Sequence, residues 1–271
     1  MKSIQRPLKL VLVIVGAVLI STLGILASDE LSGVSTRLSG LVIGSDNICP
    51  SGSTLIALGT HAVCMDNYEA SASVGCTYAD PKNEIETQSN LNSRNCQAQS
   101  QAGKLPWRFV SYTEAQQLCA RSEKRLLTND EWYRVTLGLE NPEHCFLSGA
   151  DVSLTGNNNC VTGSGVHDLV GNLWEWTQDI VYEGKYKDRA LPISGYVSLV
   201  DAEGVVIETS NSPEPAFGFD YAWTSESGAL GILRGGFYGS GQDGGIFAQN
   251  ISVPLNFRAA GIGFRCVRDL Y

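Results

Sequence analysis

The sequence predicts an α+β fold, in which a few helices accompany many short strands. Two stretches carry the capping-box pattern that marks the beginning of a helix. The rest of the chain is rich in Gly, Asn and Ser and has only short apolar runs, which is typical of short strands and long loops. All eight cysteines follow residue 48, so we expect disulfides to tie these loops together.

A hydrophobic segment stands near the N-terminus, with positive charge before it. Lys2, Arg6 and Lys9 precede an uncharged, mostly apolar run over residues 10–27. A helix that spans a bilayer needs roughly 20 apolar residues, and positive charge on one side keeps that side in the cytoplasm. We therefore expect residues 10–27 to be a membrane anchor. A signal peptide cleaved after Ala27 is the alternative, and both export the remainder to the cell surface or the periplasm.

Composition divides the chain into three regions. Residues 1–27 are predicted to be a cytoplasmic stub with the transmembrane anchor, and the polar residues 28–47 to be a stalk. From residue 48 the density of cysteines and aromatic residues rises, which indicates one domain over residues 48–271. No CxxC pair occurs, so zinc ribbons and thioredoxin-like sites are not expected. An oxidising compartment favours four disulfides, whose connectivity the cysteine spacing leaves open.

The first predicted helix begins at Ser111. Ser111 and Glu114 have the spacing of a capping box, in which the side chain of each residue accepts a hydrogen bond from the backbone N–H of the other. Ala115, Leu118 and Cys119 then fall on one face at helical spacing. This face is expected to lie in the core.

The second predicted helix begins at Thr128, which is followed by Glu131 at the same spacing. Trp132, Val135 and Leu139 continue at helical spacing, and Gly138 is expected to end the helix. The stretch of about 80 residues between this helix and the C-terminal strands is expected to be mostly loop, and loops of that length are uncommon unless they are functional or cross-linked.

One strand is expected within that stretch. Trp174 and Trp176 alternate along it, so their side chains share a face, and large aromatic side chains on one face are usually part of a core. Glu175 is expected on the opposite face. Glu175 and Asp179 could bind calcium through carboxylate oxygens, but a solvated loop surface is the preferred interpretation.

Charge and motif content exclude several classes of function. The net charge is −9 and no basic run follows residue 10, so nucleic-acid binding is not expected and the acidity is taken to serve solubility. His61, His144 and His167 are scattered and form no spaced metal pair. No GxSxG, P-loop or dinucleotide-binding glycine motif occurs. No cofactor is expected, apart from calcium as an open possibility.

Four stretches in the same order are similar to a known family. They are "CMDNYEAS" at 64–71, "VSYTEAQQLCARSEKRLLTNDEWYRVTLG" at 110–138, "GVHDLVGNLWEWTQD" at 165–179 and "LRGGFYGSG…GIGFRCVRD" at 233–269. The sequence resembles the formylglycine-generating-enzyme, or sulfatase-modifying-factor, type of C-type-lectin-like domain over residues 48–271. This resemblance implies a C-type-lectin-like α+β fold. It also implies that Arg234 and Arg265 are buried and tie loops to strands.

The resemblance further implies one disulfide, between Cys119 on the first predicted helix and Cys266 in the last strand. That bond would close a loop of nearly 150 residues and stabilise the fold by about 4–5 kcal/mol in the chain-entropy model. The remaining cysteines would then pair locally, as Cys49–Cys64, Cys76–Cys96 and Cys145–Cys160.

Catalysis of the family type is not expected in this chain. Members that oxidise cysteine to formylglycine hold copper with two cysteines shortly after the "RGG" stretch, and residues 237–245 contain none. Copper(I) requires soft thiolate ligands, which Ser240 and Gly245 cannot replace. Branches that use non-haem iron have a His-rich helical partner domain, which this sequence lacks.

A second branch of the fold is more similar. The stretch 233–268 resembles the variable region of diversity-generating-retroelement variable proteins, in which fixed frame residues alternate with rewritten ones. The frame would comprise Arg234, Gly235, Gly236, Gly241, Gly245, Ile246, Phe247, Ala248, Pro254, Ile262, Gly263, Phe264 and Arg265. The rewritten residues would comprise Phe237, Tyr238, Ser240, Asp243, Asn250, Ser252, Leu255, Asn256, Phe257 and Arg258.

This second resemblance predicts a non-enzymatic ligand-binding protein, whose variable region 234–265 meets an unknown protein or cell-surface ligand. Aromatic residues mixed with Ser, Asn, Gly and Arg are the composition of adaptable binding surfaces. Phe237, Tyr238 and Phe257 would be the anchors, with Ser240, Asp243, Asn256 and Arg258 orienting the ligand. Two alternatives remain: an enzyme or inactive homologue of the sulfatase-modifying type acting on exported proteins, and a purely structural surface module.

Overall fold

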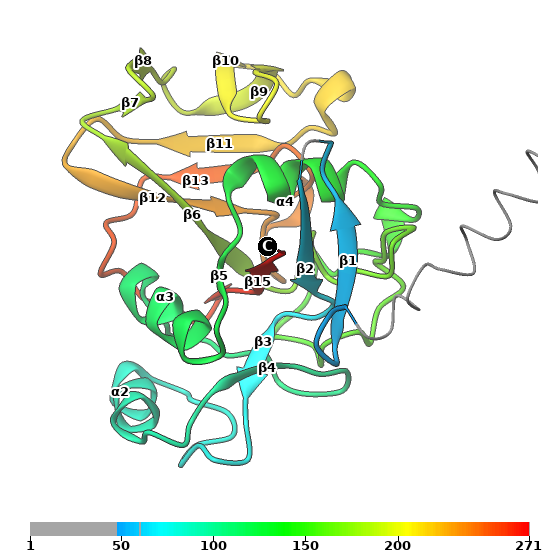
Figure 1. Ribbon diagram of the computed structural model, residues 1–271. Coiled ribbons are helices and arrows are strands. Elements are labelled where there is room, and N and C mark those ends of the chain that lie inside the picture. Colours follow the sequence, from blue (N-terminus) through cyan, green and yellow to red (C-terminus); the bar gives the residue numbers. More distant parts are fainter. Residues whose placement is uncertain (1–47, 60, 271) are drawn as a thin grey trace, which may run out of the picture. The chain divides into compact units, whose positions relative to one another are not determined.

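The structure is a computed structural model that describes residues 48–59 and 61–270 (Figure 1). Residues Cys49–Tyr271 form one compact unit. The predicted anchor at 10–27 and the predicted stalk at 28–47 lie outside the described residues. Among the residues that are described, no helix combines the length and the apolar character needed to span a membrane. The predicted α+β class is confirmed for the domain.

The two predicted helices are present, and each begins with its predicted capping box. They are α3 (Tyr112–Arg121), capped by Ser111, and α4 (Asn129–Thr136), capped by Thr128. The predicted apolar faces are buried, with Trp132 of α4 fully enclosed. The structure also contains α2 (Glu84–Asn92), which the sequence analysis did not predict. Short 3-10 turns are η2 (Pro142–His144), η3 (Pro215–Phe217) and η4 (Gly241–Asp243).

A four-stranded sheet joins the beginning of the domain to its end. Its order is β1 (Ser53–Ala57), β2 (Ala62–Asp66), β15 (Cys266–Asp269) and β5 (Arg125–Leu126). The C-terminal strand β15 thus lies between an early strand and the strand after α3, and all three contacts are antiparallel. A separate hairpin pairs β3 (Ala70–Ala72) with β4 (Ala98–Ser100).

A larger mixed sheet forms the second half of the domain, with the order β10-β9-β11-β13-β12-β6-β7-β8 and β14 beside β6. Its strands are β6 (Trp174–Tyr182), β7 (Lys185–Tyr186), β8 (Arg189–Ala190), β9 (Gly195–Val200), β10 (Val206–Ser210), β11 (Tyr221–Thr224), β12 (Ala229–Arg234), β13 (Gln249–Ile251) and β14 (Ile262–Gly263). The expectation of mostly loop before the C-terminal strands was therefore wrong. The strands there are short and separated by Gly-rich turns, which hides their period-two pattern in the sequence.

The helices cover different parts of the larger sheet. Helix α4 contacts β6 and β12, and α3 contacts β6, with α3 near the lower end of that strand in Figure 1. The side chain of Trp176 lies in the core beside α3, where its indole N–H donates to the Val110 carbonyl at 2.9 Å and its ring meets Tyr112 edge to face. Both faces of β6 are buried at this point, since Glu175 is also only 1 % exposed.

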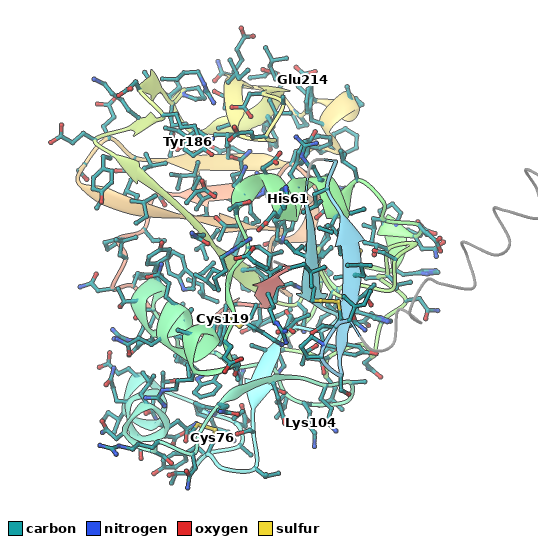
Figure 2. All side chains as sticks on the ribbon, in the orientation of Figure 1. His61, Cys76, Lys104, Cys119, Tyr186 and Glu214 are labelled. Atoms are coloured by element: carbon teal, nitrogen blue, oxygen red, sulfur yellow. A yellow bond between two sulfur atoms is a disulfide. The ribbon has the colours of Figure 1, made fainter. Side chains whose placement is uncertain are left out.

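Four disulfides link the loops and helices. They are Cys49–Cys64, Cys76–Cys96, Cys119–Cys266 and Cys145–Cys160. The Cys119–Cys266 pair that the resemblance implies and the three expected local pairs are confirmed. Figure 2 shows Cys119 on α3 and Cys76 near α2. The Cys119–Cys266 bond connects α3 to β15 across a sequence separation of 147 residues.

Candidate ligand-binding face

A buried cluster of charged side chains surrounds Arg265, the last residue of the predicted variable region. Arg265 donates through Nε to both carboxylate oxygens of Glu175, at 2.8 and 3.0 Å, and through Nη2 to the His167 carbonyl. The indole N–H of Trp132 also donates to Glu175 at 3.0 Å. The buried position of Arg265 that the resemblance implies is confirmed, since the residue is 1 % exposed.

Two further carboxyl groups lie in the same buried region. Glu69 accepts from the side chain of Asn172 and from the Leu173 N–H. Burial raises the pKa of Glu69 well above its ordinary value, and the charges of Asp168 and Glu175 raise it further. Burial likewise raises the pKa of Asp168 to about 6. The positive charge of Arg265 therefore acts on three carboxyl groups, those of Glu175, Glu69 and Asp168.

The calcium interpretation of Glu175 and Asp179 is not supported, and neither is a solvated loop surface. Both residues lie on β6, where Glu175 is buried against Arg265. Asp179 accepts instead from the Asn129 N–H at 2.6 Å and from the Tyr186 hydroxyl at 3.2 Å. The two carboxylates are therefore occupied by different donors. Within the described residues, no group of three or more His, Cys, Asp or Glu side chains is arranged to hold a metal ion.

A second buried arginine fastens the segment that follows β12. Arg234 is fully buried and donates to the carbonyls of Gly204 and Ile246 at 3.0 and 2.8 Å. Its guanidinium also lies over the Trp132 ring, 4.8 Å from the centroid. Arg234 thus ties both the β9–β10 turn and the residues after η4 to the end of β12, as the resemblance implies.

Asp220 holds the same segment from the other side. Its carboxylate accepts from the Phe247 N–H at 2.6 Å, and a side chain at Gly245 would collide with it. Burial raises the pKa of Asp220 to about 7, although the Phe247 N–H and Arg234 oppose this rise. The conformation of residues 245–248 therefore depends on two buried charged groups and on the absence of a side chain at Gly245.

The first predicted binding residues lie around η4. Phe237 packs at the edge of the core and meets Tyr238 edge to face, with ring centroids 5.1 Å apart. The Ser240 hydroxyl accepts from the Phe237 N–H at 2.9 Å and so closes the turn. Both aromatic rings and Asp243 keep part of their surface exposed.

The middle pair of predicted binding residues lies at the end of β13. Asn250 stands opposite Leu233 of β12 and Trp223 of β11 in the sheet register. Its side-chain oxygen accepts from both the N–H and the hydroxyl of Ser252, at 3.1 and 2.7 Å. The amide nitrogen of Asn250 has no acceptor among the described residues, so it remains a donor toward solvent.

The last group of predicted binding residues lies on the loop between β13 and β14, and it is not uniform. Asn256 and Phe257 are exposed, whereas Leu255 packs against the core. Arg258 donates from Nε and Nη2 to the two oxygens of Glu114 on α3, each at 2.8 Å. Arg258 is therefore bound to the framework rather than available to orient a ligand, which differs from its predicted role.

A stripe of aromatic side chains continues the face onto the neighbouring strands. We name it the aromatic stripe, and it consists of Tyr196 on β9, Tyr221 and Trp223 on β11, and Trp174 on β6. Successive ring centroids lie 5.2, 4.8 and 5.7 Å apart. Trp223 adjoins Asn250 in the register, so the stripe and the predicted binding residues are parts of one surface.

Sequence reasoning missed three of the four stripe residues. The alternation used for Trp174 and Trp176 is also present in Tyr221-Ala222-Trp223, where Ala222 is buried and both aromatic residues are partly exposed. The signal was therefore available, but the expectation of loop over this stretch concealed it.

Comparison with known proteins agrees with this architecture. Residues 142–270 match the family model described as "Sulfatase-modifying factor enzyme 1-like domain". This part of the chain is therefore similar to that family. The predicted resemblance to the sulfatase-modifying-factor type is therefore confirmed. A comparison with curated proteins finds no match.

Several solved structures are similar to the whole domain. Major Tropism Determinant P3c Variant is 19 % identical, with 81 % of this chain and 53 % of that chain covered and a TM-score of 0.48. PvdO from Pseudomonas aeruginosa is 16 % identical, with 77 and 81 % covered and a TM-score of 0.46. Treponema denticola variable protein 1 is 12 % identical, with 82 and 100 % covered and a TM-score of 0.43. The chain thus spans about half the length of the Major Tropism Determinant structure.

The sulfatase-modifying-factor-type domain of this chain does not fit the copper site of the catalytic members. Residues 237–245 contain no cysteine, and each of the eight cysteines in the sequence is in a disulfide. No thiolate pair is therefore left to bind copper(I). The same segment instead carries exposed aromatic and polar side chains on a fixed framework.

Proposed function

We propose that this protein is a membrane-anchored, surface-displayed ligand-binding protein, and that residues 237–258 are its diversified binding segment. The domain provides a cross-linked framework, and the segment presents side chains that differ between copies of the gene. This assignment corresponds to the diversity-generating-retroelement variable proteins that the C-terminal sequence resembles.

One observation carries the proposal: frame and rewritten positions differ in burial. Eight of the thirteen frame positions are buried, Arg234, Phe264 and Arg265 among them, whereas Pro254 is exposed. None of the ten positions predicted to be rewritten is buried. A segment can tolerate rewriting only where side chains do not pack in the core, because core substitutions commonly cost 2–5 kcal/mol. The pattern of burial therefore suits a segment in which most sequence changes alter binding more than folding, with Leu255 and Arg258 as positions that contact the framework.

Binding would occur by surface complementarity on a rigid scaffold. Phe237, Tyr238 and Phe257 supply large apolar contacts, and such aromatic residues contribute most of the energy in typical interfaces. Ser240, Asp243 and Asn256 would orient the ligand through hydrogen bonds. The ion pair of Arg258 with Glu114 would hold the loop in place.

The decisive experiment is to sequence the DNA that flanks the gene. We expect a second, near-identical copy of the stretch encoding residues 234–265, which differs only at adenines and lies beside a reverse-transcriptase gene. Absence of both features would refute diversification.

Membrane display has its own test. We expect the full-length chain to remain in the membrane fraction with residues 10–27 retained, as measured by intact mass. A mature protein that begins after Ala27 and fractionates as a soluble species would contradict anchoring, while leaving export unchanged.

A further inference from the structure

The aromatic stripe differs from the rest of the candidate face in being carried by strands outside the predicted rewritten segment. Tyr196 and Tyr221 are cross-strand partners, and Trp223 follows two residues later on the same face of β11. Trp174 is on β6 and is only 6 % exposed, so it supports the stripe from within. Regular strands hold these rings, and their positions would be the same in every rewritten version.

The stripe has unpaired hydrogen-bond donors along its length. The indole N–H of Trp223 and the hydroxyls of Tyr196 and Tyr221 donate no hydrogen bond to any residue that the structure describes. The amide nitrogen of Asn250, beside Trp223, is also free of a protein acceptor there. Apolar ring surface and polar donors therefore alternate along one face. Tyr and Trp are the side chains that combine these two properties.

The cross-strand partners of Tyr196 and Trp223 are uncharged, although β10 carries the exposed Glu208 two residues before Ser210. Ser210 is the partner of Tyr196 across β10 and β9, and Ser198 is two residues along the same strand. Asn250 and Ser252 flank the stripe on the other side. A neutral surface of this kind in a chain of net charge −9 does not attract anions, and the protein as a whole repels them.

From these features we infer that the aromatic stripe binds a neutral oligosaccharide. The C–H faces of sugar rings are apolar and pack on aromatic rings, while their hydroxyl groups accept from and donate to Trp, Tyr, Ser and Asn side chains. The three partly exposed rings, of Tyr196, Tyr221 and Trp223, are inclined to one another and offer edges as well as faces to such a ligand. The stripe is a constant contact, and the neighbouring rewritten residues select among ligands that present the same glycan. The inference thus rests on the proposed function and names the ligand class.

The fluorescence of Trp223, and its quenching by acrylamide, can report binding at the stripe. Among the five tryptophans, Trp107, Trp132 and Trp176 are at most 1 % exposed and Trp174 is 6 % exposed, so Trp223 is the one that the neutral quencher acrylamide can reach most readily. We would titrate the full-length protein with neutral hexasaccharides of glucose, mannose and N-acetylglucosamine, and with a uronic-acid hexasaccharide. We expect at least one neutral hexasaccharide to protect the fluorescence from acrylamide, and the charged one not to do so.

Three variants locate the binding. Trp223→Phe should abolish the quenching signal, and Tyr196→Ser should weaken neutral-hexasaccharide affinity about tenfold or more, measured by calorimetry. Tyr182→Ala is the matched control, because Tyr182 is a 60 % exposed aromatic residue at the far end of β6, outside the stripe. The affinity of the Tyr182→Ala variant for the neutral hexasaccharide should stay within about twofold of that of the parent protein. Circular dichroism melting of each variant establishes that it is folded.

Three results would overturn the inference. They are protection by none of the neutral hexasaccharides, equal binding of the uronic-acid hexasaccharide, and a Tyr196→Ser variant that binds like Tyr182→Ala. The outcome is independent of the DNA test. Glycan binding without a second gene copy would refute diversification alone, and a second gene copy without glycan binding would refute the ligand class alone.

Discussion

At the scale of single residues, Arg265 is the cation that pairs with the buried carboxylate of Glu175. Burial raises the pKa of Glu175, and the charge and hydrogen bonds of Arg265 oppose that rise. An unpaired buried charge is far more costly than a buried pair. The geometry of this cluster therefore depends on a single side chain.

We predict that Arg265→Met lowers the free energy of unfolding by about 3–5 kcal/mol at pH 7. The loss should be smaller at pH 5, because the carboxyl groups then become protonated and no longer need a cation. Urea denaturation at the two pH values measures both effects. Arg268→Met, at an exposed position on β15 three residues further along the chain, is the control and should change stability by less than about 0.5 kcal/mol.

Asp220 should make stability depend on pH. Its pKa is about 7 in the folded protein, above the ordinary value of 3.8. A raised carboxyl pKa means that this group favours the folded state at low pH, and that its contribution is lost as the pH rises from about 4 to 7.

We predict that Asp220→Asn flattens the pH dependence of stability in this window, because the amide cannot ionise and its oxygen can still accept from Phe247. Thermal melting between pH 4 and 8 measures the change. Curves for the variant and the parent that remain parallel over the whole range would refute the assignment.

At the scale of elements, the first turn of α3 both caps the helix and binds the loop between β13 and β14. Glu114 accepts from the Ser111 N–H and hydroxyl as part of the capping box, and the same carboxylate binds Arg258. Burial alone would raise the pKa of Glu114, but Arg258 and Ser111 outweigh it and lower the pKa. The cap of this helix thus also fixes the loop between β13 and β14.

We predict that Arg258→Ala loosens this loop and lowers the free energy of unfolding by about 1.5–3 kcal/mol. The N–H groups of Phe109 and Tyr112, which donate to the carbonyls of Ala259 and Leu255, should exchange hydrogen faster. Hydrogen exchange by NMR measures this. Asn256→Ala is the control, since its exposed side chain leaves the backbone carbonyl that Arg258 contacts unchanged.

The elements also show what could be predicted from the sequence. The helices α3 and α4 were predictable because a capping box coincides with an apolar face. Helix α2 was missed because its face is mostly polar, although Asn83 caps it by accepting from the Glu86 N–H. The strands β9–β11 were missed because they are short and the stretch was expected to be mostly loop, although β11 does alternate. Buried pairs such as Glu175 with Arg265 join residues 90 positions apart, and periodicity holds no information at that distance.

At the scale of the whole molecule, the Cys119–Cys266 bond joins the middle of the chain to its end. We predict that replacing both cysteines with Ala lowers the free energy of unfolding by about 5 kcal/mol, and that replacing Cys145 and Cys160 lowers it by about 3 kcal/mol, because the second bond closes a much shorter loop. Guanidinium denaturation of both variants measures the difference. A larger loss for the second pair would contradict the loop-length argument.

The same bond has a consequence for how the protein can evolve. Residues 237–258 lie inside the covalent ring that Cys119 and Cys266 close. The bond acts mainly by restricting the unfolded chain, so its contribution does not depend on which side chains the ring contains. If this segment is rewritten from copy to copy, every version inherits the same reserve of stability. Mildly unfavourable versions would then still fold, and a larger share of random sequences would be available to selection for binding.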